Sequence, residues 1–296
     1  MRVVFVHGAC VKDGSWWWHR TGELLAAKGV ASEAPSLPSC GETGEPTGAL
    51  GPGLAEDVAA VRQVLITSDE PTVLVAHSYG GIVTADAAAG LDTVRHLLLI
   101  SSYLPEVGQS LSSFGSEDPA PFLDIDPADG TFTVRTDALA LTFLHDCDAA
   151  IQREAESKTA RQSLAVLEQP VSSAAWQQID STYLVCAEDR GTPAARQREF
   201  ARLARNVVEL DAGHHPFLSQ PNVVRDLILG LCRARSTRRG PPRIPPSHLT
   251  QVRDDPTIHQ RHERGARLTE LAEATLEGLA DRLEPGCHRP TTIRAI

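Results

Sequence analysis

One serine of this chain lies in a pattern that can make it a nucleophile. Residues 73–81 read Val-Leu-Val-Ala-His-Ser-Tyr-Gly-Gly, a short apolar run followed by small-x-Ser-x-Gly. A serine on a sharp turn between a strand and a helix projects its hydroxyl above the sheet edge, and the crowded backbone needs small residues two places before and after it. Ala76 and Gly80 meet that need, so Ser78 is the candidate nucleophile.

Two other interpretations of this stretch are weaker. An ordinary serine in a glycine-rich turn would not require the buried strand before it and the helix after it. A phosphate-binding loop would need a Walker lysine or a G-x-G-x-x-G spacing, and the sequence has neither here.

A serine hydroxyl becomes a good nucleophile only when a base takes its proton and a carboxylate orients that base. In folds that use a strand-to-helix serine turn, the chain order is Ser, then Asp or Glu, then His. Asp189 follows the apolar run at 182–187 and is the predicted acid, with Glu188 as the alternative. His214 follows the run at 207–210 and is the predicted base. His215 is its alternative, and Pro216 restricts the backbone of His215 to extended conformations.

An acyl-transfer site also needs two backbone N–H groups aimed at the oxyanion. The residue after the nucleophile, Tyr79, supplies one. The loop after the first apolar run, residues 7–10, is placed to supply the other, and Ala9 is the best candidate. Gly8 would let that loop approach the serine closely.

Short apolar runs alternate with helical patterns along the chain. This alternation, interrupted once, predicts an α/β fold: a doubly wound, mostly parallel sheet with a helical cap insertion. The expected core is 1–104 and 181–235. The expected cap or lid is 105–180, with helical segments around 138–168 and one short polar β-like piece at 131–135. The expected strands are 3–7, 72–77, 96–102, 182–187 and 207–210, and the expected helices are 16–28, 54–66, 80–89, 193–204 and 222–233.

The C-terminal segment 236–296 has a different composition from the rest. It holds seven prolines, ten arginines and no lysine, and only residues 268–283 show a helical pattern. Such a segment cannot bury much apolar surface, so we expect a poorly ordered tail with one helix.

The overall composition limits which partners and which compartment we expect for this protein. The net charge of −10 disfavours a nucleic-acid partner, which usually meets a basic face. The six cysteines form no C-x-x-C pair, so we expect free thiols, no metal site and a reducing compartment. The N-terminal apolar run is too short for a signal peptide, and no stretch is long enough to span a membrane. The expectation is a cytoplasmic protein that needs no cofactor and has no membrane partner, with its oligomeric state left open.

Together these residues resemble the branch of the α/β-hydrolase superfamily that holds plant salicylate-ester esterases, hydroxynitrile lyases and bacterial esterase-like members. The resemblance covers roughly residues 1–235. It implies an α/β core, a helical cap, catalysis without a cofactor, and the site roles given above. The matching segments are Phe-Val-His-Gly-Ala-Cys at 5–10 with a tryptophan cluster after it, Ala-His-Ser-Tyr-Gly-Gly at 76–81, Glu-Asp-Arg at 188–190 and Gly-His-His-Pro-Phe-Leu-Ser at 213–219.

Two departures from the lyases bear on the chemistry. The lyases have a threonine where this chain has Gly8, and a lysine that positions cyanide where this chain has His215. Hydrolysis is therefore favoured over lyase chemistry. The expected substrate pocket includes Gly8, Trp16, Phe143 and His215, although three adjacent indoles at 16–18 cannot all face one way on a helix.

The resulting hypothesis is a serine hydrolase. It would cleave a small or medium carboxylic ester, thioester or lactone through an acyl-enzyme at Ser78. The alternatives on the same fold are a lyase, a cofactor-free oxygenase, and a ligand-binding receptor that has lost turnover.

Overall fold

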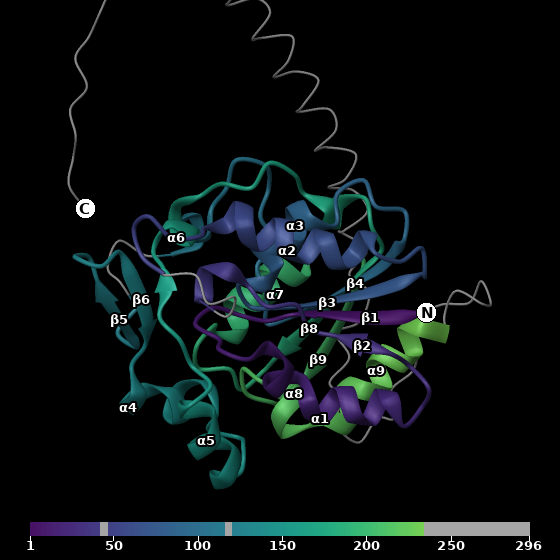
Figure 1. Cartoon of the computed structure of the whole chain (residues 1–296). Coiled ribbons are helices and arrows are strands. Elements are labelled where there is room, and N and C mark those ends of the chain that lie inside the picture. The colour runs from purple at the N-terminus through teal and green to yellow at the C-terminus, as the bar shows by residue number, and fades with distance from the viewer. Residues whose placement is uncertain (42–46, 116–119, 234–296) are drawn as a thin grey trace, which may run out of the picture. The chain divides into compact units, whose positions relative to one another are not determined.

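The computed structural model describes residues 1–41, 47–115 and 120–233. A six-stranded sheet, all of whose pairs are parallel, forms its centre (Figure 1). The strand order is β2-β1-β3-β4-β8-β9. The bounds are β1 (Arg2–Val6), β2 (Ser32–Glu33), β3 (Thr72–His77), β4 (Val94–Ile100), β8 (Ser181–Cys186) and β9 (Asn206–Leu210).

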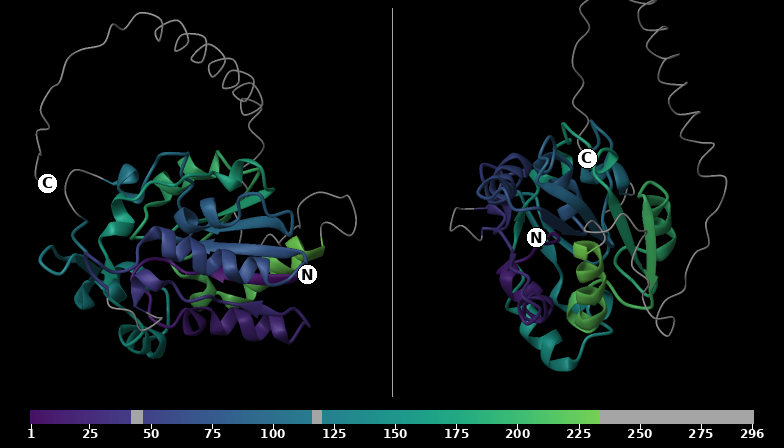
Figure 2. Two further views of the ribbon diagram at one scale, coloured as in Figure 1. Left: turned by 45° about the horizontal axis from the view of Figure 1, so that its top comes forward. Right: turned by 90° about the vertical axis from the view of Figure 1, so that its right-hand side faces the viewer.

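Helices cover both faces of the sheet, which confirms the doubly wound prediction. Val3 and Phe5 of β1 pack with α1 and α9, whereas Val4 and Val6 pack with α2 and α3 on the other face. Figures 1 and 2 show these helix pairs on opposite sides of the strands. Because the central strands are covered twice, they carry apolar runs rather than alternating patterns. The helix bounds are α1 (Gly14–Ala26), α2 (Leu54–Ile66), α3 (Gly80–Ala87), α7 (Ala194–Ala201), α8 (Pro216–Ser219) and α9 (Pro221–Arg233).

The insertion at 105–180 is not purely helical, and the expectation of a helical cap is corrected here. It contains an antiparallel sheet, in the order β5-β6-β7, beside its short helices. The sequence analysis missed β5 and β7 because they are short and mostly polar, so no apolar run marks them. The bounds are β5 (Leu123–Asp126), β6 (Thr131–Val134), β7 (Gln162–Ser163), α4 (Thr136–Ala138), a π-helical turn (Leu139–Phe143), α5 (Ala149–Glu156), α6 (Ala165–Glu168) and 3₁₀ turns at Leu111–Phe114 and Ala175–Gln177.

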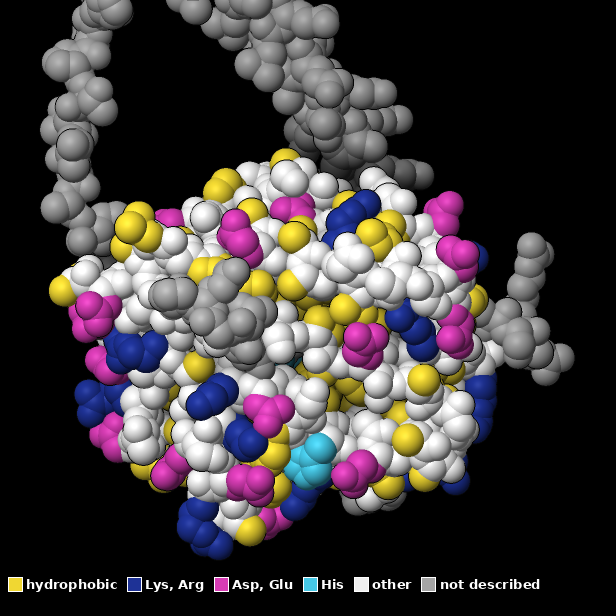
Figure 3. Space-filling view, viewed as in Figure 1, with side chains coloured by type: hydrophobic (Ala, Val, Ile, Leu, Met, Phe, Trp, Pro, Cys, Tyr) yellow, Lys and Arg dark blue, Asp and Glu magenta, His cyan; other side chains and the backbone are white. Residues whose placement is uncertain are grey.

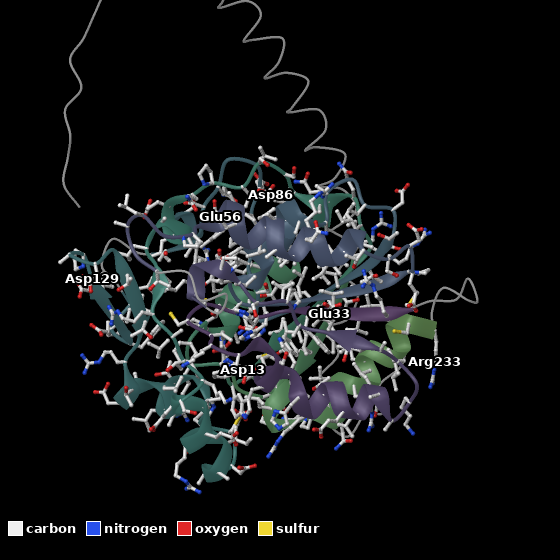
Figure 4. All side chains as sticks on the ribbon, viewed as in Figure 1. Asp13, Glu33, Glu56, Asp86, Asp129 and Arg233 are labelled. Carbon is white, nitrogen blue, oxygen red and sulfur yellow. The ribbon has the colours of Figure 1, made fainter. Side chains whose placement is uncertain are left out.

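Hydrogen bonds tie this insertion to the core. Asp13, which caps the N-terminus of α1, accepts from Lys158 Nζ at 2.8 Å, and the Lys12 amide donates to the Lys158 carbonyl. Near the end of α3, Asp86 accepts from the amide and hydroxyl of Ser172. Figure 4 labels both aspartates, which come from the two helical layers. The insertion is therefore fastened on both sides of the sheet.

Three further expectations concern the cysteines, the C-terminal tail and membrane spans. The five cysteines within the described residues are free thiols, whereas the predicted tail and its helix at 268–283 lie outside those residues. Among the described helices, none has the length and apolarity that a membrane span requires. On the face that Figure 3 shows, acidic and basic side chains are interspersed rather than gathered by sign.

Gly81, at the start of α3, provides a test of how closely the backbone packs at the turn between β3 and α3. A Cβ added at Gly81 would lie 2.1 Å from the Tyr103 carbonyl oxygen, so Gly81→Ala forces backbone to move. We expect it to lower the free energy of unfolding by more than about 2 kcal/mol in urea denaturation. The control Gly22→Ala, inside α1 and facing only the Ser32 hydroxyl at 3.3 Å, should be neutral or stabilising. Equal stability of the two variants would contradict this account of the turn.

Candidate active site

The turn between β3 and α3 holds Ser78 in a conformation that non-glycine residues rarely adopt. Its φ is 50°, in the left-handed region. The Ser78 amide donates to the Ile100 carbonyl at 3.2 Å, and its carbonyl accepts from the Ser102 hydroxyl at 2.8 Å. A Cβ at Gly80 would lie 2.6 Å from the Val6 carbonyl oxygen, which is why this position is glycine. Ser78 is half-buried between fully buried neighbours, so its side chain keeps access to the site.

Asp189 and His214 meet at the carboxyl ends of β8 and β9. The Nδ1 of His214 lies 2.7 Å from Asp189 Oδ2, and both side chains are buried. The same carboxylate accepts from the Ser101 hydroxyl and from the amides of Gly191 and Thr192. Asp189, rather than its neighbour Glu188, therefore holds the histidine.

The carboxylate of Asp189 is kept ionised by its partners. Burial alone would raise its pKa, but His214 and the donated hydrogen bonds outweigh burial and lower the pKa below its usual value. A carboxylate hydrogen-bonded in this way fixes the tautomer of the histidine, with the proton on Nδ1 and a lone pair on Nε2. That lone pair is what a general base offers.

The loop after β9 positions His214. The Gly213 amide donates to Asp146 of the insertion at 2.7 Å, and the His214 carbonyl lies 3.0 Å from His77 Nε2. The ring of His77, which directly precedes Ser78, is centred 4.5 Å from that of His214. The Ser78 hydroxyl makes no hydrogen bond with the protein in the described part of the chain. Serine–histidine contacts in empty sites often form only when substrate binds.

The two predicted oxyanion donors come from separate segments that lie close together. A Cβ at Gly8 would lie 3.1 Å from that of Ser78, so the loop after β1 passes directly over the serine turn. Within the described residues, neither the Ala9 amide nor the Tyr79 amide donates to another protein group. Free backbone donors beside a nucleophile are what an oxyanion hole requires.

A buried series of side-chain hydrogen bonds, not anticipated from the sequence, links those two segments. Asp57 of α2 accepts from the Tyr79 hydroxyl at 2.7 Å and from the Ser39 hydroxyl at 2.6 Å. Ser39 accepts from Gln162 of β7, whose side-chain oxygen accepts from the Cys10 amide. Asp57 is fully buried, and burial raises its pKa although the hydrogen bonds from Ser39 and Tyr79 oppose this. A signal was present, because an aspartate on the apolar face of a predicted helix needs a partner.

The three tryptophans at 16–18 point in different directions, as consecutive residues on a helix must. Trp17 lies over His215, with ring centres 4.8 Å apart, and Trp18 stacks in the core against Phe217. Trp16, the predicted pocket residue, instead donates to Glu154 of α5. Trp17 is therefore the indole that contacts His215.

Phe143 and His215, two further residues predicted to line the pocket, both lie against His214. The ring of Phe143 is centred 5.0 Å from that of His214, and its carbonyl oxygen lies 3.0 Å from His215 Nδ1. Burial, together with the proximity of His214, lowers the pKa of His215 to about 3. Neutral His215 thus cannot act as the cation that a lysine would provide at this position.

Comparison with known proteins identifies the family. The family model described as "Alpha/beta hydrolase family" matches residues 3–227. The chain belongs to the alpha/beta hydrolase family. It is 29% identical over 222 residues to the alpha/beta hydrolase nvfD of Aspergillus novofumigatus, covering 69% of this chain and 85% of that protein. It is also 32% identical over 119 residues to methylesterase 8 of Arabidopsis thaliana, covering 37% of this chain and 40% of that one. These matches confirm the predicted resemblance.

Two solved structures share this fold. A pyrethroid hydrolase from Sphingobium faniae JZ-2 superposes with a TM-score of 0.69 at 21% identity, over 80% of this chain and 98% of its own. Polyneuridine aldehyde esterase superposes with a TM-score of 0.65 at 22% identity, over 78% and 98%.

The buried histidines predict how stability depends on pH. His215, with a folded pKa of about 3, and His77, whose pKa burial also lowers, stay neutral while the unfolded chain protonates below about pH 6.5. The free energy of unfolding should therefore fall by about 1 kcal/mol per pH unit for each histidine as the pH drops from 6.5 toward 4.

Urea denaturation of a His215→Gln variant over this pH range tests whether His215 contributes to the loss of stability as the pH falls. The variant should show a shallower loss of stability with falling pH than the wild type. Gln178→Leu, which changes an exposed side chain that does not titrate, is the control and should keep the wild-type slope. Identical slopes for the wild type and His215→Gln would show that His215 does not stay neutral in the folded protein.

Proposed function

We propose that this alpha/beta hydrolase cleaves small or medium neutral carboxylic esters, thioesters or lactones through an acyl-enzyme at Ser78. The observation that carries the proposal is the 2.7 Å hydrogen bond between Asp189 and His214 beside the strained turn of Ser78. Non-glycine residues with positive φ recur at functional sites, because the surrounding structure must hold them there.

The chemistry follows from the atoms in place. Ser78 Oγ attacks the carbonyl carbon while His214 Nε2 takes the hydroxyl proton, and Asp189 stabilises the imidazolium that forms. The amides of Ala9 and Tyr79 stabilise the tetrahedral oxyanion. As the C–O bond to the alcohol breaks, His214 returns the proton to the leaving oxygen. Water, deprotonated by His214, then attacks the acyl-enzyme and releases the acid.

The surroundings of the site favour a neutral, partly apolar substrate. The rings of Trp17 and Phe143 lie against His215 and His214, and the loop at Gly8 brings backbone rather than a charged side chain to the serine. Relatives named as methylesterases and structural neighbours named as a pyrethroid hydrolase and an esterase support ester chemistry. The neutral state of His215 argues against a lyase, which would need a cation beside His214.

Removing the nucleophile tests the proposal. Ser78→Ala should lower kcat on p-nitrophenyl acetate by at least about 1,000-fold, because no acyl-enzyme can form. The variant should also lose labelling by a fluorophosphonate probe. Thermal unfolding should remain cooperative, which separates lost chemistry from lost folding. A wild-type rate in Ser78→Ala would contradict the assignment of the nucleophile.

The buried chain from Tyr79 to Cys10 predicts a second, positioning effect. Gln162→Leu removes the side chain that holds the Cys10 amide and Ser39, so the Ala9 loop should shift relative to Tyr79. Since an oxyanion hole acts mainly on the transition state, kcat should fall about 10-fold or more while KM changes little. The control Gln178→Leu alters an exposed side chain and should leave both constants unchanged. An unchanged kcat in Gln162→Leu would show that these hydrogen bonds do not position the oxyanion donors Ala9 and Tyr79.

A further inference from the structure

Three histidines converge beside the serine turn. The ring centres of His77 and His214 lie 4.5 Å apart, those of His77 and His215 4.7 Å, and those of His214 and His215 4.9 Å. All three side chains are at most 6% exposed, so the cluster belongs to the interior of the protein and is not a contact between surface side chains. The catalytic scheme uses one of the three as a base and leaves the others without a chemical role.

Each histidine of the cluster uses one ring nitrogen for a hydrogen bond to an oxygen. His77 Nε2 lies 3.0 Å from the His214 carbonyl, and His215 Nδ1 lies 3.0 Å from the Phe143 carbonyl. His214 Nδ1 lies 2.7 Å from the Asp189 carboxylate. These oxygens can only accept, so each bonded nitrogen carries the proton of a neutral ring. The remaining nitrogens are His77 Nδ1, His214 Nε2 and His215 Nε2, and each presents a lone pair.

This arrangement is the one that metal-binding histidines use. A ligating imidazole commonly donates its other N–H to a carbonyl or a carboxylate, which fixes the tautomer and the orientation of the ring. Burial also favours the neutral forms of His77 and His215, which are the forms that bind metal. Potential ligand atoms of the three residues all lie within 4.8 Å of one another.

We propose that His77, His214 and His215 form a binding site for one borderline divalent cation of the Zn²⁺ class. A tetrahedral zinc with bonds of about 2.1 Å holds its nitrogens about 3.4 Å apart, so nitrogens that now lie up to 4.8 Å apart must approach by up to about 1.4 Å. Three imidazoles suit zinc, nickel and copper better than magnesium, which prefers oxygen. The fourth position stays open to water or to the Ser78 hydroxyl.

Occupation of this site has a consequence for catalysis. Zinc would use the His214 lone pair that a general base must offer to Ser78, so the cation acts as a reversible inhibitor. The inhibition rests on the proposed ester hydrolysis, whereas the binding does not.

Calorimetric titration of the full chain with Zn²⁺ alone, in metal-free buffer, tests the binding. The wild type and Ser78→Ala should each bind one zinc per chain at this site. His214→Gln and His215→Gln should weaken that binding at least about 100-fold, and His19→Gln should not. Cooperative thermal unfolding of each variant guards against misfolding as the cause. The visible absorption of Co²⁺ bound to the wild type reports the geometry of the site.

Two results would overturn the site. One is the absence of zinc binding in the wild type. The other is equal zinc binding by the wild type, His214→Gln and His215→Gln, which would assign the metal to other groups, such as His259 and His262 outside the described residues.

Activity assays separate this inference from the proposed function. Zn²⁺ should inhibit p-nitrophenyl acetate hydrolysis, EDTA should restore it, and Mg²⁺ at the same concentration should have no effect. Zinc binding that depends on His214 and His215 in a chain without esterase activity would sustain the site and overturn the proposed function. Full activity with zinc bound at these histidines would overturn the role of His214 as base.

Discussion

The backbone turn at Ser78 is the constraint from which the rest of the site follows. A side chain at φ 50° is strained, and here several groups hold it in place: the Ile100 carbonyl, the Ser102 hydroxyl and the close passage of the chain at Gly80 and Gly81. The same turn presents the serine hydroxyl and brings His77 against the loop that carries His214. It also leaves the Tyr79 amide without a partner among the residues that the structure describes. Loosening the turn would affect all of these together.

The insertion at 105–180 contributes hydrogen bonds to the site. Asp146 accepts from the Gly213 amide beside the base, the Phe143 carbonyl orients His215, and Gln162 holds the Cys10 amide after the proposed oxyanion donor. These contacts come from three different elements of the insertion. Cap and core therefore set the site jointly, which explains why polar residues of the insertion are buried.

Much of the core could be predicted because buried parallel strands and helices leave strong patterns. The bounds of α2 and β3 agree with the sequence analysis, and chain order placed Asp189 and His214 at neighbouring strand ends, where they are hydrogen-bonded. The strand β2 was missed because it is only two residues long and both are exposed, so no apolar run marks it.

The remaining features depend on contacts between distant segments, which periodicity does not encode. The Asp57 chain joins α2, the turn at Ser39 and β7, and its only local sign was a carboxylate on an apolar helix face. Trp16 was expected at the pocket, but the rotation of α1 places Trp17, and not Trp16, against His215. The convergence of His77 with His214 and His215 likewise arises only when β3 and the loop after β9 meet.

The central claim, a covalent acyl-enzyme at Ser78, can be observed directly. A slowly released ester, mixed with the full chain and quenched in acid, should raise the intact mass by one acyl group. Peptide mapping should then place that group on the fragment containing Ser78, and the adduct should decay at the rate of turnover. Sustained turnover with no adduct, or with the acyl group on another residue, would contradict the account.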